Sequence, residues 1–171
     1  VATATEDNTK SLQLFEMQNG FYPDNAAYEI ALTEDVIFLD IAATVGRDML
    51  VVFYAGSAVQ LDPRTGATRH LVEFSSIYNG PVDQKIPKLD MVRDLNGDSL
   101  DDFIIPGFKG YGVYIQNRDG TFGNGISLNA RPIMDISFRD NPWYQARKTY
   151  HADVTNDGRA DLVFWVVDKF M

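Results

Sequence analysis

The sequence predicts an all-β fold, and three observations support that prediction. Apolar residues recur in short runs of β-branched and aromatic residues, without the spacing of an amphipathic helix. The runs are bounded by Gly, Asn, Asp or Pro, with turn dipeptides such as Asn79-Gly80 and Asp119-Gly120 between them. Many short strands in close succession are typical of an antiparallel sandwich, barrel or propeller.

The candidate strands cover the chain from its first quarter to its end. Residues 12–21 have the pattern of a strand followed by a turn at Asn19-Gly20. Residues 1–11 are largely polar, so we expect a flexible N-terminal segment there. The remaining candidate strands, in order, are Val36–Ile41, Met49–Tyr54, Ala58–Leu61, Thr68–Phe74, Leu89–Val92, Phe103–Pro106, Gly112–Gln116, Ile133–Phe138 and Leu162–Val167.

Composition excludes several classes of protein. With 171 residues, of which 45% are hydrophobic, the chain has enough apolar material for a core, and one domain is the default. Its net charge of −9 argues against nucleic acid and against an anionic membrane surface as partner. No apolar run is long enough to cross a membrane. The absence of cysteine excludes disulfides, Cys-ligated zinc and a thiol nucleophile.

Three segments of the chain align as repeats. In each, an Asp is followed eight residues later by a second Asp, and an apolar strand comes next. The leading residues are Asp40, Asp94 and Asp153, so the repeats are offset by 54 and 59 residues. This spacing divides residues 12–171 into the end of one unit (12–34), a degenerate repeat (35–88), a complete repeat (89–147) and the start of another (148–171).

The second and third repeats contain oxygen-bearing side chains at alternate positions of a tight loop. Alternate positions in a turning backbone aim successive oxygens at one point, and six to eight hard oxygen ligands suit Ca²⁺ better than the stricter octahedron of Mg²⁺. Position 12 of each loop lies in an apolar strand, where an EF-hand would need a Glu. We therefore predict one Ca²⁺ in each loop, two in all. The candidate ligands are Asp94, Asn96, Asp98, the Leu100 carbonyl and Asp102, then Asp153, Thr155, Asp157, the Arg159 carbonyl and Asp161.

The first repeat lacks this ligand pattern. Ala42 and Thr44 occupy the third and fifth positions, so only Asp40 and Asp48 remain. We expect this segment to keep the turn and to bind no metal.

The two complete loops resemble those of the FG-GAP/VCBS repeats found in integrin-α-like β-propellers. Asp94–Phe103 and Asp153–Leu162 match the loop motif, and Asn117–Gly123 is similar to the strand-turn tail of such repeats. The resemblance implies one four-stranded antiparallel blade per repeat, with Ca²⁺ in a hairpin loop at the blade's edge. Ser99 replaces the usual Gly at position 6, which should strain that turn, and Thr155 should weaken the third-repeat site. Propellers close with four to eight blades, so about three repeats imply an incomplete fragment of a larger propeller.

The function implied by the resemblance is a non-catalytic binding or adhesion module stabilised by calcium. It would be secreted, extracellular, on the cell surface or periplasmic, with a protein or carbohydrate ligand, or further blades of a larger propeller, as partner. One alternative is the propeller part of a secreted polysaccharide lyase or hydrolase. Another is a structural subunit of a surface assembly. Residues that could serve the enzyme are Trp143, Tyr144, Arg147, Lys148, Tyr150 and His151.

Overall fold

The computed structural model describes residues 2–4, 10–33, 35–77, 90–107, 109–130 and 149–164, which form strands and turns without a helix. The prediction of an all-β chain is confirmed. Nothing in these ranges is a helix of the length and apolarity needed to span a membrane. The strands are β1 (Ala2–Ala4), β2 (Lys10–Leu14), β3 (Tyr28–Leu32), β4 (Phe38–Thr44), β5 (Arg47–Phe53), β6 (Ser57–Leu61), β7 (Thr68–Glu73), β8 (Val92–Arg93), β9 (Asp102–Gly107), β10 (Gly110–Tyr114), β11 (Ile126–Leu128), β12 (Tyr150–Ala152) and β13 (Asp161–Val163).

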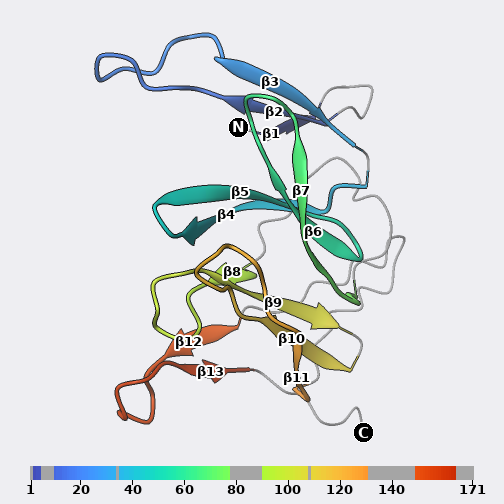
Figure 1. Ribbon diagram of the computed structural model, residues 1–171, viewed down its shortest axis with the longest axis vertical. Helices are drawn as coiled ribbons and strands as arrows, with labels where there is room; N and C mark the ends of the chain where they lie inside the picture. Colours follow the sequence, from blue (N-terminus) through green and yellow to red (C-terminus); the bar gives the residue numbers. More distant parts are fainter. Residues whose placement is uncertain are drawn as a thin grey trace, which may run out of the picture.

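The described strands form separate antiparallel sheets that follow the order of the chain. The first sheet contains β1, β2 and β3, the second β4 to β7, the third β8 to β11, and the fourth β12 and β13. Within each sheet, strands that are neighbours in sequence pair with each other. Figure 1 shows the sheets one after another along the long axis of the molecule, in chain order. The described sheets therefore form a series of meanders, and none of them closes into a barrel.

The N-terminal segment contains two strands where we expected a flexible end. β1 pairs with β2 between Ala2↔Leu12 and Ala4↔Lys10, and the backbone pairing accounts for the difference. The Lys10 side chain is buried, and its Nζ donates a hydrogen bond to the carbonyl of Val36 at 3.0 Å. This contact connects the first sheet to the chain segment that enters the second.

The sequence analysis did not predict four of the strands, which are β1, β3, β11 and β12. Three of them, β1, β11 and β12, have only three residues each, too few to show a periodic pattern. The fourth, β3, contains the apolar residues Ile30, Ala31 and Leu32, a run that the prediction overlooked. The predicted strand Ile133–Phe138 lies outside the described residues, as do Leu89 and the end of Leu162–Val167.

The core consists of apolar layers between successive sheets. Strand β5 shows the principle, because its side chains alternate between two faces. Val51 and Phe53 pack in one cluster with Phe103 of the third sheet, where the Phe53 and Phe103 rings meet edge to face with centroids 5.1 Å apart. The intervening Val52 packs with residues of the first sheet in a second cluster. Both faces of β5 are thus covered, which explains its unbroken apolar sequence.

The third sheet repeats this arrangement. Phe103 and Ile105 of β9 face the second sheet. Ile104 lies between them and packs with Tyr111, with Leu162 of β13 and with Phe164, which follows β13. The rings of Tyr111 and Phe164 lie with centroids 4.7 Å apart. The second and third sheets are therefore each held by apolar contacts to the sheets before and after them in the chain.

Candidate metal centre

The two predicted calcium loops have the same length and the same strand register. Arg93 pairs with Asp102 across β8 and β9, and Ala152 pairs with Asp161 across β12 and β13. Residues 94–101 and 153–160 are therefore loops of equal length, and each ends at the Asp that opens the following strand.

The loops also share their unusual backbone conformations. Position 4 has a positive φ in both, 82° at Gly97 and 58° at Asn156, and so does position 6, 70° at Ser99 and 84° at Gly158. Two segments 59 residues apart thus have left-handed residues at the same two positions, although the residues there differ. Ser99 adopts the left-handed conformation that disfavours a Cβ, as its replacement of Gly predicted.

The first Asp of each loop accepts hydrogen bonds from the backbone across the turn. Asp94 Oδ1 accepts from the Gly97 amide at 2.7 Å, and Asp94 Oδ2 accepts from the Ser99 amide at 2.8 Å. In the third repeat, Asp153 accepts from the amides of Asp157 at 3.1 Å and Gly158 at 2.9 Å. A carboxylate at position 1 thus organises each loop from within.

The last Asp closes each loop, in two different environments. Asp102 is completely buried, and it accepts hydrogen bonds from the amides of Leu95 at 3.0 Å and Gln116 at 2.8 Å. Burial raises the pKa of Asp102, and these two bonds oppose the shift. Asp161 accepts from the amides of Thr155 and Val154, both at 3.0 Å, and the bond from Thr155 is the main reason that its pKa is lowered.

The side chains at positions 3 and 5 are bonded within the loop. Asn96 Oδ1 accepts from the Asp98 amide and Asp98 Oδ1 from the Leu100 amide, both at 2.9 Å. Asp157 makes the equivalent bond to the Arg159 amide at 2.9 Å. Across the described ranges, no three His, Cys, Asp or Glu side chains gather closely enough to hold a metal ion.

The donor set nevertheless has the chemistry that a hard cation requires. Each carboxylate oxygen has two lone pairs, so an oxygen that accepts one amide hydrogen can still coordinate a metal. All candidate donors are oxygens, which suits Ca²⁺. The assignment of the ten predicted ligands remains a prediction.

The degenerate repeat forms a closed hairpin in place of a loop. β4 and β5 stay paired up to Ala43↔Asp48 and Thr44↔Arg47, and only Val45 and Gly46 turn between them. The Thr44 hydroxyl donates to the Arg47 carbonyl at 2.6 Å. Asp40 pairs with Val51, so the ladder places Asp40 and Asp48 at different registers and does not bring them together.

A contact between sheets, which sequence reasoning missed, fastens the loop of the second repeat. The amide of Asp101 donates to the carbonyl of Ala43 at 3.0 Å, and Asp101 Oδ2 accepts from the Ala43 amide at 2.6 Å. The buried Gln116 donates through Nε2 to both carbonyls, at 3.1 Å to Ala43 and 2.6 Å to Asp101. We call these three residues the Asp101 clasp.

The clasp uses an exposed edge of the second sheet. β4 is an edge strand, so the backbone groups of Ala43 are available to a neighbouring sheet. The third loop has Ala160 at the position of Asp101 and lacks the carboxylate for such a contact. The only sequence signal was the doubled Asp at 101 and 102, and Asp101 does not belong to the predicted ligand pattern.

The residues considered for an enzyme are mostly outside the described ranges. This applies to Trp143, Tyr144, Arg147 and Lys148. Tyr150 and His151 lie on β12, and His151 Nε2 is buried without a hydrogen-bond partner in the described structure.

Comparison with known proteins gives no relative: no family model matches the chain, and no curated protein or solved structure is significantly similar to it. The resemblance to FG-GAP/VCBS repeats rests on the loop motifs and remains a prediction.

Proposed function

We propose that the chain is part of a calcium-stabilised β-propeller that serves as a non-catalytic binding module outside the cytoplasm. The observation that supports this most is the pair of loops, 94–102 and 153–161. They share length, register and left-handed positions, and they have oxygen-bearing side chains at positions 1, 3, 5 and 9. Two unrelated turns would not be expected to agree in length, register, left-handed positions and side-chain chemistry.

The arrangement of sheets supports the propeller part of the proposal. The second and third sheets are four-stranded meanders of sequential strands, and they pack face to face through the cluster around Phe53 and Phe103. The first and fourth sheets continue the series on either side. A blade of a propeller is such a meander, packed between its neighbours around a central axis. Further blades would complete the ring.

Calcium in these loops would have a structural role. Burial is the main reason that the pKa of Asp102 is raised, and the charges of Asp98 and Asp94 raise it further. A divalent cation would neutralise them, so metal binding and folding would be coupled. Extracellular modules can use weak sites, with dissociation constants of about 10⁻⁴–10⁻³ M, because calcium is plentiful there. The ligand of such a module would be a protein or a glycan.

Thermal unfolding in calcium, in magnesium and in EGTA tests the calcium assignment. We expect EGTA to lower the melting temperature and magnesium to restore it only in part. Asp98→Ala should lower the calcium-dependent part of the melting temperature, and Asp48→Ala, an exposed Asp of the closed hairpin, serves as the matched control. Equal effects of the two substitutions, or no effect of EGTA on the unmodified chain, would refute the assigned role.

A further inference from the structure

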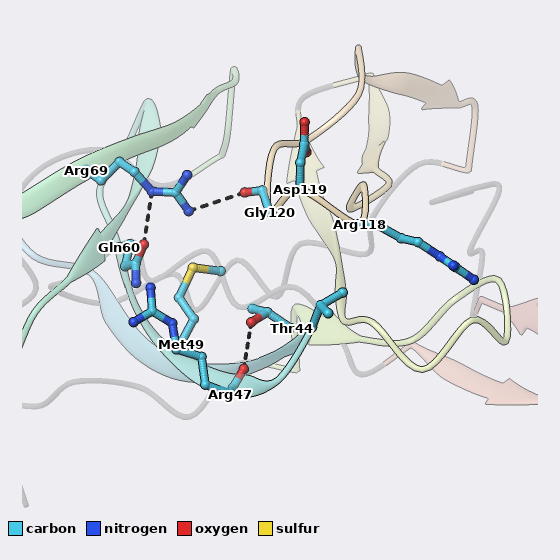
Figure 2. A pocket seen from close by; sticks show the side chains of 9 residues that line it. Thr44, Arg47, Met49, Gln60, Arg69, Arg118, Asp119 and Gly120 are labelled. Carbon is cyan, nitrogen blue, oxygen red and sulfur yellow. Dashed lines mark hydrogen bonds between the residues drawn. The ribbon is translucent and has the colours of Figure 1, made fainter.

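A small pocket lies where the β4–β5 hairpin approaches the turn 118–120 of the third sheet (Figure 2). Its volume is about 130 Å³. Thr44, Arg47 and Met49 line it from the hairpin, Gln60 and Arg69 from β6 and β7, and Gly120 from the turn. The pocket is separate from the residues assigned to calcium.

The pocket concentrates positive charge in a chain whose net charge is −9. Three arginines line it, Arg47, Arg69 and Arg118, with Asp119 as the one acid among the lining residues. The carboxylate of Asp119 accepts hydrogen bonds from the amide and the hydroxyl of Thr121, at 2.9 and 2.6 Å, so it is held by its own turn. These bonds are the main reason that the pKa of Asp119 is lowered, and the charge of Arg69 adds a smaller contribution. Figure 2 shows Arg118 running outward, away from the other two arginines.

One of the two inner guanidinium groups is fixed in position. Arg69 Nε donates to Gln60 Oε1 at 3.0 Å, and Arg69 Nη2 donates to the Gly120 carbonyl at 3.3 Å. These bonds use two of the five N–H donors of a guanidinium, so others remain for a ligand. In Figure 2 the Gln60 side chain lies between the guanidinium groups of Arg69 and Arg47.

The second guanidinium group, that of Arg47, has no hydrogen-bond or ion-pair partner among the residues that the structure describes. Within the described part of the chain, the ion pairs of arginine are Arg64–Glu16 and Arg93–Asp90, and Arg47 belongs to neither. Its side chain is exposed beside the pocket, and its backbone is held in β5. The pocket therefore contains guanidinium N–H donors of Arg47 and Arg69 that could bind an anion.

We propose that this pocket binds an oxyanion: a carboxylate, sulfate or phosphate group carried by a ligand that otherwise lies outside it. Guanidinium donors match the paired oxygens of such groups. The volume is well below the ~300–1,000 Å³ of a site that encloses a whole small molecule, so the pocket suits a single group. Because its walls come from two sheets, the bound group would also connect them. The proposal does not depend on calcium.

Arginine Nε–H signals in NMR spectra, followed during titration, test the proposal. The full chain is titrated with sodium sulfate, phosphate or glucuronate at constant ionic strength, with chloride as the compensating salt, because screening alone shifts exposed charges. We expect saturable shifts at Arg47 and Arg69 with at least one of the three anions. Glucuronate binding identifies an acid sugar as a source, whereas binding of sulfate or phosphate alone identifies an inorganic or esterified anion.

Three charge-matched variants separate a site from general attraction. Arg47→Gln and Arg69→Gln should each weaken binding about tenfold, the loss of a charge-assisted contact worth about 1.4 kcal/mol. Arg118→Gln removes the same charge from a side chain that points away and should change affinity less than about twofold. The Arg47 side chain makes no hydrogen bond or ion pair within the described residues, so its variant remains informative if Arg69→Gln unfolds. Shifts that do not saturate, or equal losses in all three variants, would overturn the proposal.

Discussion

The β4–β5 hairpin and the β8–β9 connection start from aligned sequence, yet one is closed and the other is open. In the hairpin, pairing continues to Thr44↔Arg47. In the β8–β9 connection, pairing stops at Arg93↔Asp102, and the residues between turn back on themselves. The difference lies in the side chains at alternate positions, since Ala42 and Thr44 of the hairpin correspond to Asn96 and Asp98 of the loop.

The comparison shows what keeps such a loop open. The carboxylate of Asp94 accepts hydrogen bonds from the amides of Gly97 and Ser99. The side-chain oxygen of Asn96 accepts one from the amide of Asp98. Side-chain oxygens thus satisfy backbone donors that would otherwise pair across a strand ladder. In the hairpin, positions 3 and 5 are Ala42 and Thr44, without a carboxylate or amide oxygen to accept these donors, and the backbone groups pair in the ladder instead. The oxygens that build the loop are also the candidate calcium ligands.

Removal of the leading Asp should give the largest effect. Asp94→Ala removes the carboxylate that accepts hydrogen bonds from the Gly97 and Ser99 amides, and it removes a proposed calcium ligand. We expect a loss of about 2–3 kcal/mol in the free energy of unfolding in calcium, measured by chemical denaturation. Asp40→Ala, the aligned position in the closed hairpin, should cost less than about 1 kcal/mol. A cost at Asp40 as large as at Asp94 would show that the two segments do not differ as described.

Breaking the Asp101 clasp should have the next largest effect. Asp101→Ala removes the carboxylate that accepts the Ala43 amide, a charge-assisted bond that contributes about 1.5 kcal/mol or more. Because Asp101 is not among the proposed ligands, the loss should be similar in calcium and in EGTA. Asp48→Ala removes an equal charge nearby and is the control. A loss that disappears in EGTA would instead make Asp101 a ligand.

The strain at Ser99 can be relieved. Ser99→Gly should stabilise the chain by a few tenths to about 1 kcal/mol, because relief of the strained φ of 70° outweighs the greater freedom of glycine in the unfolded state. Gly158→Ser places the same residue at the same position of the other loop, where φ is 84°, and should destabilise it. Differential scanning calorimetry of the two variants measures both signs. Shifts of the same sign would contradict the shared conformation.

The smallest effect is expected at position 3 of the third loop. Thr155→Asp adds a carboxylate where the second loop has Asn96, so it should raise calcium affinity at the third-repeat site, by about tenfold. It should change stability little in EGTA. Isothermal titration calorimetry would resolve the change, and an unchanged affinity would remove Thr155 from the ligand set.

The sequence predicted the features that depend on local chemistry. The strands with unbroken apolar runs, such as Phe103–Pro106, were predicted because both of their faces are buried between sheets. The loop boundaries followed from the spacing of Asp94 and Asp102, and the left-handed Ser99 followed from its place in the turn.

Features that depend on contacts between distant segments could not be predicted in the same way. β1 is defined by its pairing with β2, and β12 by its pairing with β13. The role of Asp101 depends on Ala43, 58 residues earlier in the chain. The pocket beside Arg69 likewise combines residues of four strands, β4 to β7, with the turn 118–120, which no local pattern brings together.

A crystal structure determined in millimolar calcium, with anomalous scattering data, tests the central claim most directly. We predict one calcium peak in each of the loops 94–102 and 153–161, with oxygen ligands at 2.3–2.6 Å, a range typical of this ion. The β4–β5 hairpin should have no peak between Asp40 and Asp48. Well-defined loops without a peak, with their carboxylates bonded only to backbone amides, would contradict the proposal that calcium stabilises this fold.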